Sequence, residues 1–168
     1  MSSWLQGRRV RLIGDCPAIA RAVRAQGAVL VADGAADALI HVAASPPNRP
    51  LHELNLADWR ATLDAGLDQR FLMAKAFAAE RRAAGKGGAI VFVGAPEQAL
   101  GSDHAAAVGA LGNLTKTLGV EWARDGIRVN SIQTGETGET LGNLAAYLIS
   151  DYAAYVTGAV MGVGSHGD

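Results

Sequence analysis

The sequence contains few residues that could form disulfide bonds or bind metal ions: one cysteine, Cys16, and four histidines. A single thiol excludes a disulfide within the chain and a metal site built on several cysteines. Cys16 stands near the start of an expected helix, where a thiol pKa can fall, but it has no identifiable partner base. We therefore expect it to be a packed or partly exposed bystander. The histidines lack metal-type spacing, so we expect no metal site. They are His41, His52, His104 and His166.

Charge and long apolar runs are also scarce. The formal net charge is −1 at pH 7, and the basic residues are spread along the chain. The sequence therefore shows no cluster of basic residues of the kind that binds nucleic acids or anionic membranes. No apolar run approaches the roughly 18 residues of a membrane span. Residues 1–9 lack the apolar core of a secretory signal. We therefore expect neither a nucleic-acid nor a membrane partner, and a cytoplasmic location.

The sequence is rich in apolar residues: 49% are hydrophobic and 18% are charged, which is typical of a soluble packed domain. A length of 168 residues suits a single domain, 1–168. Continuous apolar runs alternate with amphipathic stretches, which predicts an α/β fold with a doubly wound parallel sheet. About six strands are expected, at 10–13, 28–32, 38–43, 89–93, 127–132 and 159–163.

Helices are expected between most of these strands. Pro17 opens the first one, and Gly27 marks its end. A long helix with a broad apolar stripe follows the third strand. The helices after the first run from Asn55 or Asp58 to about Ala84, from Ser102 or Asp103 to about Ala123, and over 141–150, with the first-named residues as candidate caps.

Three segments carry a resemblance to a known family. Residues 114–135, LTKTLGVEWARDGIRVNSIQTG, are similar to the segment after the active-site helix of classical short-chain dehydrogenase/reductases. Residues 150–163, SDYAAYVTGAVMGV, resemble that family's C-terminal motif, and residues 58–71, DWRATLDAGLDQRF, resemble one of its helices. The chain is identified as a member of this family. The resemblance implies a Rossmann-like fold and NAD-dependent oxidoreductase chemistry.

The turn with which this family binds its dinucleotide is altered. In the family, the pattern T-G-x-x-x-G-x-G lets the backbone approach the pyrophosphate. Here Gly14 remains, Ala18 and Ala20 replace later glycines, and Asp15 adds a negative charge. Asp33 follows Gly14 by 19 residues, where an acid could hold an adenosine ribose, although we favour a strand-end turn residue. We expect no cofactor and no cofactor-binding residue, while weak NAD binding at Gly14 and Asp33 stays open.

A segment of the family is also missing. Its members place a helix, a strand and a second helix between the second strand and the strand that ends in NNAG. Here four residues separate Asp33 from the strand at 38–43, and His41 to Ala44 stand at NNAG. The resemblance therefore implies a sheet without one edge strand and its flanking helices. His41 lies on an apolar strand, and we expect it to be a hydrogen-bonded core histidine.

The residues that would carry the family's chemistry are replaced. The resemblance implies a Tyr-x-x-x-Lys pair for proton transfer, a Ser that polarises the carbonyl and an Asn that holds a water molecule. We expect no catalytic residue at these positions. His104 stands for the Tyr, Val108 for the Lys, Ala95 or Gly94 for the Ser, and Gly66 for the Asn.

A new catalytic cluster on the same helix is one alternative to this loss. Ser102, Asp103 and His104 would make a poor triad, because residues one or two apart on a helix do not face each other.

The loop that would carry the family's substrate lid is short. Thr134 stands where the family has proline, and residues 135–140, GETGET, leave almost no substrate lid before Leu141. Glu136 and Glu139 are expected to be solvated loop charges.

The segments that match best are those with which the family builds subunit contacts. They include the long helices at about 58–84 and 103–123 and the last helix and strand at about 141–163. Our leading hypothesis is a non-catalytic subunit that scaffolds an intact short-chain dehydrogenase in an α2β2 heterotetramer. A hydroxyacyl-CoA dehydrogenase, such as one for (hydroxybenzyl)succinyl-CoA, would fit. Two alternatives stay open: a homo-oligomeric binding protein for another small ligand, and a residual NAD-dependent oxidoreductase acting through His104.

Overall fold

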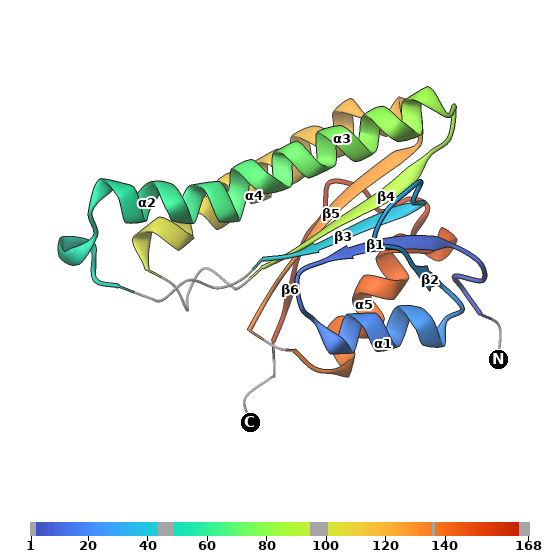
Figure 1. Ribbon diagram of the computed structural model, residues 1–168, viewed down its shortest axis with the longest axis horizontal. Helices are drawn as coiled ribbons and strands as arrows, with labels where there is room; N and C mark the ends of the chain where they lie inside the picture. Colours follow the sequence, from blue (N-terminus) through green and yellow to red (C-terminus); the bar gives the residue numbers. More distant parts are fainter. Residues whose placement is uncertain (1–2, 44–48, 95–100, 136, 165–168) are drawn as a thin grey trace.

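The computed structural model describes residues 3–43, 49–94, 101–135 and 137–164. These residues form a six-stranded sheet, ordered β2-β1-β3-β4-β5-β6, in which every neighbouring pair is parallel (Figure 1). This confirms the predicted Rossmann-like α/β fold. The strands are β1 (Arg9–Ile13), β2 (Val29–Leu30), β3 (Ala38–Val42), β4 (Gly88–Gly94), β5 (Ile127–Thr134) and β6 (Val160–Val163).

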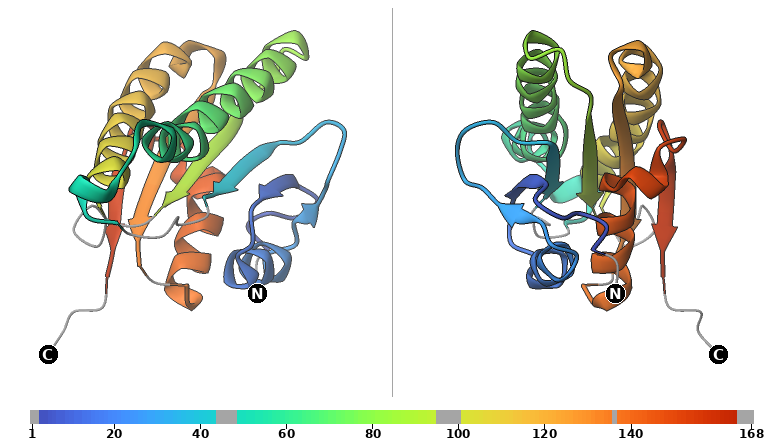
Figure 2. Two further views of the ribbon diagram at one scale, coloured as in Figure 1. Left: turned by 60° about the vertical axis from the view of Figure 1, so that its left-hand side comes forward. Right: turned by 90° about the vertical axis from the view of Figure 1, so that its right-hand side faces the viewer.

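Helices cover both faces of the sheet (Figure 2). One face carries α1 (Pro17–Ala25) and α5 (Glu139–Ile149). The other carries α3 (Gln69–Ala83) and α4 (Ser102–Glu121), and α2 (Leu56–Leu63) packs against α4. None of the helices in the described ranges is both long enough and apolar enough to cross a membrane.

Strand β4 shows why the strands are apolar throughout. Ile90 and Phe92 pack into the cluster beneath α3 and α4, whereas Val91 and Val93 pack into the cluster beneath α1 and α5. Successive side chains of a strand point to opposite faces. A strand covered on both faces therefore needs a continuous apolar run, which is the pattern in the sequence.

The sheet ends at β2, which pairs with β1 alone in the described part of the chain. Residues 31–37 lead directly from β2 to β3 without a further helix or strand, as predicted from the missing family segment. The strand is shorter than the predicted 28–32. After the Val31 N–H bonds to the Val10 carbonyl (3.0 Å), the chain must leave this side of β1 to reach β3 on the other side.

The predicted long helix is present but interrupted. Asn55 caps α2, because its side chain accepts a hydrogen bond from the Asp58 N–H at 2.9 Å. A π-helical turn, η2 (Asp64–Asp68), then joins α2 to α3. Such turns are rare and recur at functional sites. Gly66, which the sequence resemblance matches to the family's Asn, lies inside this turn.

Two predicted helix starts need correction. Neither Ser102 nor Asp103 caps α4; Gly101 is the N-cap residue and no side chain bonds there. Asp103 instead accepts a hydrogen bond from the hydroxyl of Thr62 in α2, at 2.7 Å, so a tertiary contact has taken the carboxylate that the local pattern assigned to the cap. The last helix begins at Glu139, earlier than predicted, so Glu139 is an exposed first-turn residue of α5 rather than a loop charge.

Candidate functional site

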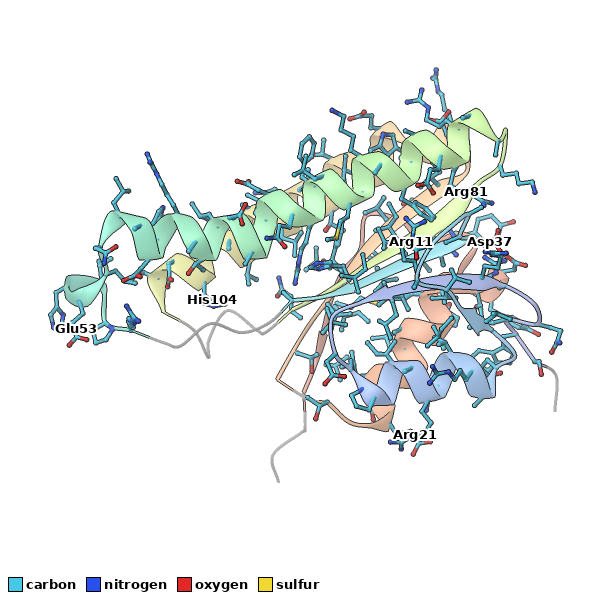
Figure 3. All side chains as sticks on the ribbon, viewed as in Figure 1. Arg11, Arg21, Asp37, Glu53, Arg81 and His104 are labelled. Atoms are coloured by element: carbon cyan, nitrogen blue, oxygen red, sulfur yellow. The ribbon has the colours of Figure 1, made fainter. Side chains whose placement is uncertain are left out.

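Three strands end at the edge of the sheet where open parallel α/β folds bind their ligands. There, β1 leads into Gly14, β3 ends at Val42 and β4 ends at Gly94. Figure 3 shows His104 in the first turn of α4 at this carboxyl edge, with Arg81 and Asp37 at the opposite end of the sheet. The positions that resemble the family's site therefore do gather in one region of the fold.

Gly14 has a structural role of its own. Its φ is +88°, and a Cβ atom added there would lie 2.1 Å from the carbonyl oxygen of Val42. Only glycine fits a left-handed turn that touches a neighbouring strand so closely. The survival of Gly14 is therefore explained by the β1–β3 contact without any ligand.

The start of α1 offers few groups to a phosphate. Pro17 occupies the first helical positions and has no N–H, and Cys16, the buried N-cap residue, makes no side-chain cap bond. The Ala20 N–H is bonded to the Cys16 carbonyl at 3.1 Å. The Ala18 carbonyl lies against α5, where a Cβ atom on Gly142 would stand 2.6 Å from its oxygen. The amide donors left at this helix end are fewer than in a glycine-rich turn.

Asp33 lies in the bend that follows β2, and its side chain is exposed. Within the part of the chain that the structure describes, it makes no hydrogen bond or ion pair. This location agrees with the turn role favoured from the sequence.

On α4, both residues at the family's Tyr and Lys positions are buried: His104 and Val108 are each 8% exposed. Burial lowers the pKa of His104, with the nearby Arg70 acting in the same direction and Asp103 opposing. Burial alone would raise the pKa of Asp103, but the hydrogen bond from Thr62 and those from backbone amides outweigh it and lower that pKa. Because Asp103 bonds to Thr62 and Ser102 is exposed, the structure does not arrange Ser102, Asp103 and His104 as a triad.

Gly66, at the family's Asn position, makes a close helix contact. A Cβ atom added to it would lie 3.0 Å from the Cβ of Ala107 on α4. The family's Ser position falls on Gly94, at the end of β4, or on Ala95, which lies outside the described residues, as do Ala44, Glu136 and His166. Neither glycine offers a side chain for chemistry.

A buried arginine from α3 reaches the same edge, and the sequence patterns did not single it out. Arg70 is 2% exposed, and its Nη2 donates to the Val93 carbonyl at 2.7 Å. A Cβ atom on Gly94 would lie 3.4 Å from the terminal nitrogens of Arg70, so the absence of a side chain at Gly94 leaves room for the guanidinium. Burial lowers the pKa of Arg70 to about 10. The sequence does contain a signal for the burial of Arg70, because this residue stands three positions after Leu67 and four before Ala74, on the apolar stripe of the helix.

Two histidines lie within electrostatic range of Arg70. Burial, followed by the charge of Arg70, lowers the pKa of His41 on β3 to about 4. Arg70 also helps to lower the pKa of His104. His41 is a core histidine as predicted, but its Nδ1 has no hydrogen-bond partner among the described residues, and the same is true of His104 Nε2 and Arg70 Nε. We refer to Arg70, His41 and His104 as the Arg70 cluster.

Two surface hollows, of about 430 and 470 Å³, lie at the opposite, amino edge of the sheet. Arg128 borders both, but its guanidinium is already bonded to the carbonyls of Leu148 (2.6 Å) and Ser150 (3.0 Å) at the end of α5. These contacts give the arginine a structural role. In the described ranges, no three His, Cys, Asp or Glu side chains come together as a metal site.

Comparison with known proteins identifies the family. A family model described as Enoyl-(Acyl carrier protein) reductase matches residues 13–140. The cis-4-hydroxycyclohexanecarboxylate dehydrogenase of Sinomonas cyclohexanicum is 33% identical, with 77% of this chain aligned to 65% of that protein. The D-threitol dehydrogenase of Mycolicibacterium smegmatis is 31% identical, with 80% of this chain aligned to 64% of that protein. The chain thus spans just under two thirds of the length of these relatives.

Solved structures agree on the fold. A short-chain type dehydrogenase/reductase from Mycobacterium marinum is similar with a TM-score of 0.87 and 21% sequence identity, over 95% of this chain and 94% of that chain. The family model covers the β1–α1 turn, Gly66 and the first two turns of α4, so the altered positions lie inside the matched region. The chain belongs to the short-chain dehydrogenase/reductase family.

Proposed function

We propose that this chain is a non-catalytic member of its family, which assembles in the cytoplasm with an intact short-chain dehydrogenase subunit. The observation that carries the proposal is the packing at Gly66 and Val108, the positions of the family's Asn and Lys. Gly66 faces Ala107 at close range, and Val108 is a buried apolar residue. Neither position offers a proton donor or acceptor, and both are filled by helix packing.

His104 by itself is a poor replacement for the family's Tyr. A general acid or base works best when its pKa lies near the working pH. Burial moves the pKa of His104 downward, and the residue one helical turn later, Val108, has no charge with which to tune it. This argues against a residual oxidoreductase that acts through His104.

The residues at the β1–α1 turn do not fit the pyrophosphate of a dinucleotide. Pro17 lacks an N–H, and Asp15 brings a negative charge to the place where phosphates would bind. The residues of this turn therefore do not fit NAD as a cofactor of this chain. In the proposed complex, the oxidoreductase chemistry typical of the relatives would belong to the partner subunit.

The proposed contact surface is the outer side of α3 and α4. Phe71 and Leu72 on α3 are 43% and 58% exposed, and Val120 on α4 is 79% exposed. Exposed large apolar side chains on these two helices are candidates for burial against another protein. A partner with the same fold would present matching helices, and two copies of each chain would close a heterotetramer.

The test is to purify a tagged form of this chain from its native host and to identify what accompanies it. We expect an intact short-chain dehydrogenase to accompany it. The dehydrogenase activity of the purified complex would be assayed first with a hydroxyacyl-CoA as substrate. Phe71→Glu should release the partner, whereas Val29→Glu, an exposed apolar position on β2, should not. Activity should survive His104→Ala. A chain that emerges alone and monodisperse would overturn the proposal, as would activity that disappears with His104→Ala.

A second candidate function is the binding of a small ligand in the altered cleft. The specific observation that favours it is the Arg70 cluster, with its three unpartnered nitrogen atoms. The two functions are compatible, because the cluster lies inside the fold and the proposed contact surface lies outside it.

A further inference from the structure

Arg70 is a buried positive charge without a counter-ion among the described residues. Its side chain is 2% exposed, and its Nη2 hydrogen bond to the Val93 carbonyl engages a neutral group. In the part of the chain that the structure describes, no carboxylate lies within ion-pair distance of Arg70, and its Nε has no hydrogen-bond partner. Buried charges in proteins are normally paired, so an arginine in this state requires an explanation.

Two further nitrogen atoms, on side chains that interact electrostatically with Arg70, also lack a partner among the described residues. His41 and His104 are both more than nine-tenths buried, and His41 Nδ1 and His104 Nε2 have no partner among the described residues. Both imidazoles interact electrostatically with Arg70, which brings together side chains from β3, α3 and α4. Three of the five unpartnered buried side-chain atoms in the described ranges belong to these residues.

The first turn of α4 already holds a carboxylate of the chain. Helix α4 is 20 residues long, and its N-cap is Gly101. Asp103 accepts hydrogen bonds from the Thr62 hydroxyl at 2.7 Å and from the backbone amides of Asp103 and His104. The Ala105 N–H bonds to the Gly101 carbonyl at 2.9 Å. The amide donors of this turn are therefore largely engaged, and a ligand would depend on the side chains of the Arg70 cluster.

We infer that the Arg70 cluster forms a binding site for the carboxylate group of a small ligand. A guanidinium can bond a carboxylate through two parallel N–H groups, and the carboxylate would supply the missing counter-ion. The two imidazoles would donate from His41 Nδ1 and His104 Nε2. Each unpartnered nitrogen of the cluster would then have an acceptor.

The charge of the site favours a singly charged ligand. Both imidazoles are neutral near neutral pH, because the pKa of His41 falls to about 4 and that of His104 is lowered too. Arg70 is therefore the cation of the site, and the negative charge of Asp103 stands beside His104. A single cation with neutral donors suits a carboxylate better than the double charge of phosphate. This inference does not rest on the proposed partner subunit.

The experiment follows the histidine side-chain nitrogens of the full chain by NMR while sodium acetate is added. Sodium chloride at equal ionic strength and inorganic phosphate serve as comparisons. We expect saturable shifts of His41 and His104 with acetate and none with the other two salts. An equal response to chloride, or tighter binding of phosphate than of acetate, would overturn the inference. A wild-type protein that shows no acetate-specific shift would do so without any variant.

Two variants locate the site. Arg70→Met removes the charge and keeps an apolar stem, and we expect it to weaken acetate binding at least about tenfold. Arg60→Met, at an exposed arginine of α2, is the matched control and should bind acetate like the wild type. Full affinity in folded Arg70→Met would contradict the inference. Co-purification of a partner with Arg70→Met would separate this result from the assembly proposed above.

Discussion

Gly66 lies so close to α4 that a Cβ atom built on it would stand 3.0 Å from the Cβ of Ala107. The contact joins the π-helical turn η2 to the helix that bears His104 and Val108. A residue that resembles a catalytic position in sequence is therefore a packing position in the structure. We therefore expect a substitution of Gly66 to lower the free energy of unfolding.

We expect Gly66→Asn to destabilise the protein by about 1–2 kcal/mol, because the larger side chain must push α4 away. Urea unfolding measures the change. Ala107→Gly in the same chain should recover part of the loss, since it removes the methyl group that Asn would meet. Losses that simply add in the double variant would contradict this contact.

Gly14→Ala should cost roughly 2–4 kcal/mol, because it combines a positive φ with an approach of 2.1 Å to the Val42 carbonyl oxygen. Gly7→Ala is the matched control: its φ is +73°, and no atom lies within 4 Å of the added Cβ. That variant should lose only about 1 kcal/mol from backbone strain. Equal losses in urea unfolding would show that the β1–β3 contact contributes nothing.

The protein should lose stability on mild acidification because of His41. Its pKa is about 4 in the folded chain and 6.5 without the fold, so below pH 6.5 the unfolded state binds a proton that the folded state refuses. Between pH 7 and pH 5 this removes about 2 kcal/mol from the free energy of unfolding. His41→Leu should flatten the profile by that amount. A pH dependence unchanged by this variant would show that His41 titrates normally.

Arg128→Met should loosen the end of α5, because the guanidinium bonds to the carbonyls of Leu148 and Ser150. We expect a loss of about 2–3 kcal/mol and faster amide exchange in the last turn of α5. Arg128→Lys should rescue little, since an ammonium cannot bridge both carbonyls as a planar fork does. Arg21→Met is the control, at an exposed arginine that points away from the fold in Figure 3. A similar loss in both Met variants would contradict the capping role.

Sequence reasoning worked where the determining interactions are local or repeated. The apolar runs of β3 and β4 predict buried parallel strands, and Pro17 and Asn55 mark helix starts that the structure confirms. It was wrong where a distant group competes for the same atom. Asp103 is of a residue type that often caps helices, but its carboxylate accepts a hydrogen bond from the hydroxyl of Thr62 at 2.7 Å. A local sequence pattern does not contain this distant partner.

The sequence by itself determined the α/β fold and the direct connection from the second strand to the third, because both follow from periodicity and motif spacing along the chain. It also predicted which residues stand at the family's catalytic positions. The tertiary structure alone decided that Gly66 faces Ala107 and that Arg70 lies within electrostatic range of His41 and His104. These groups come from different strands and helices. Their burial, pKa values and missing partners arise only when the parallel strand ends converge.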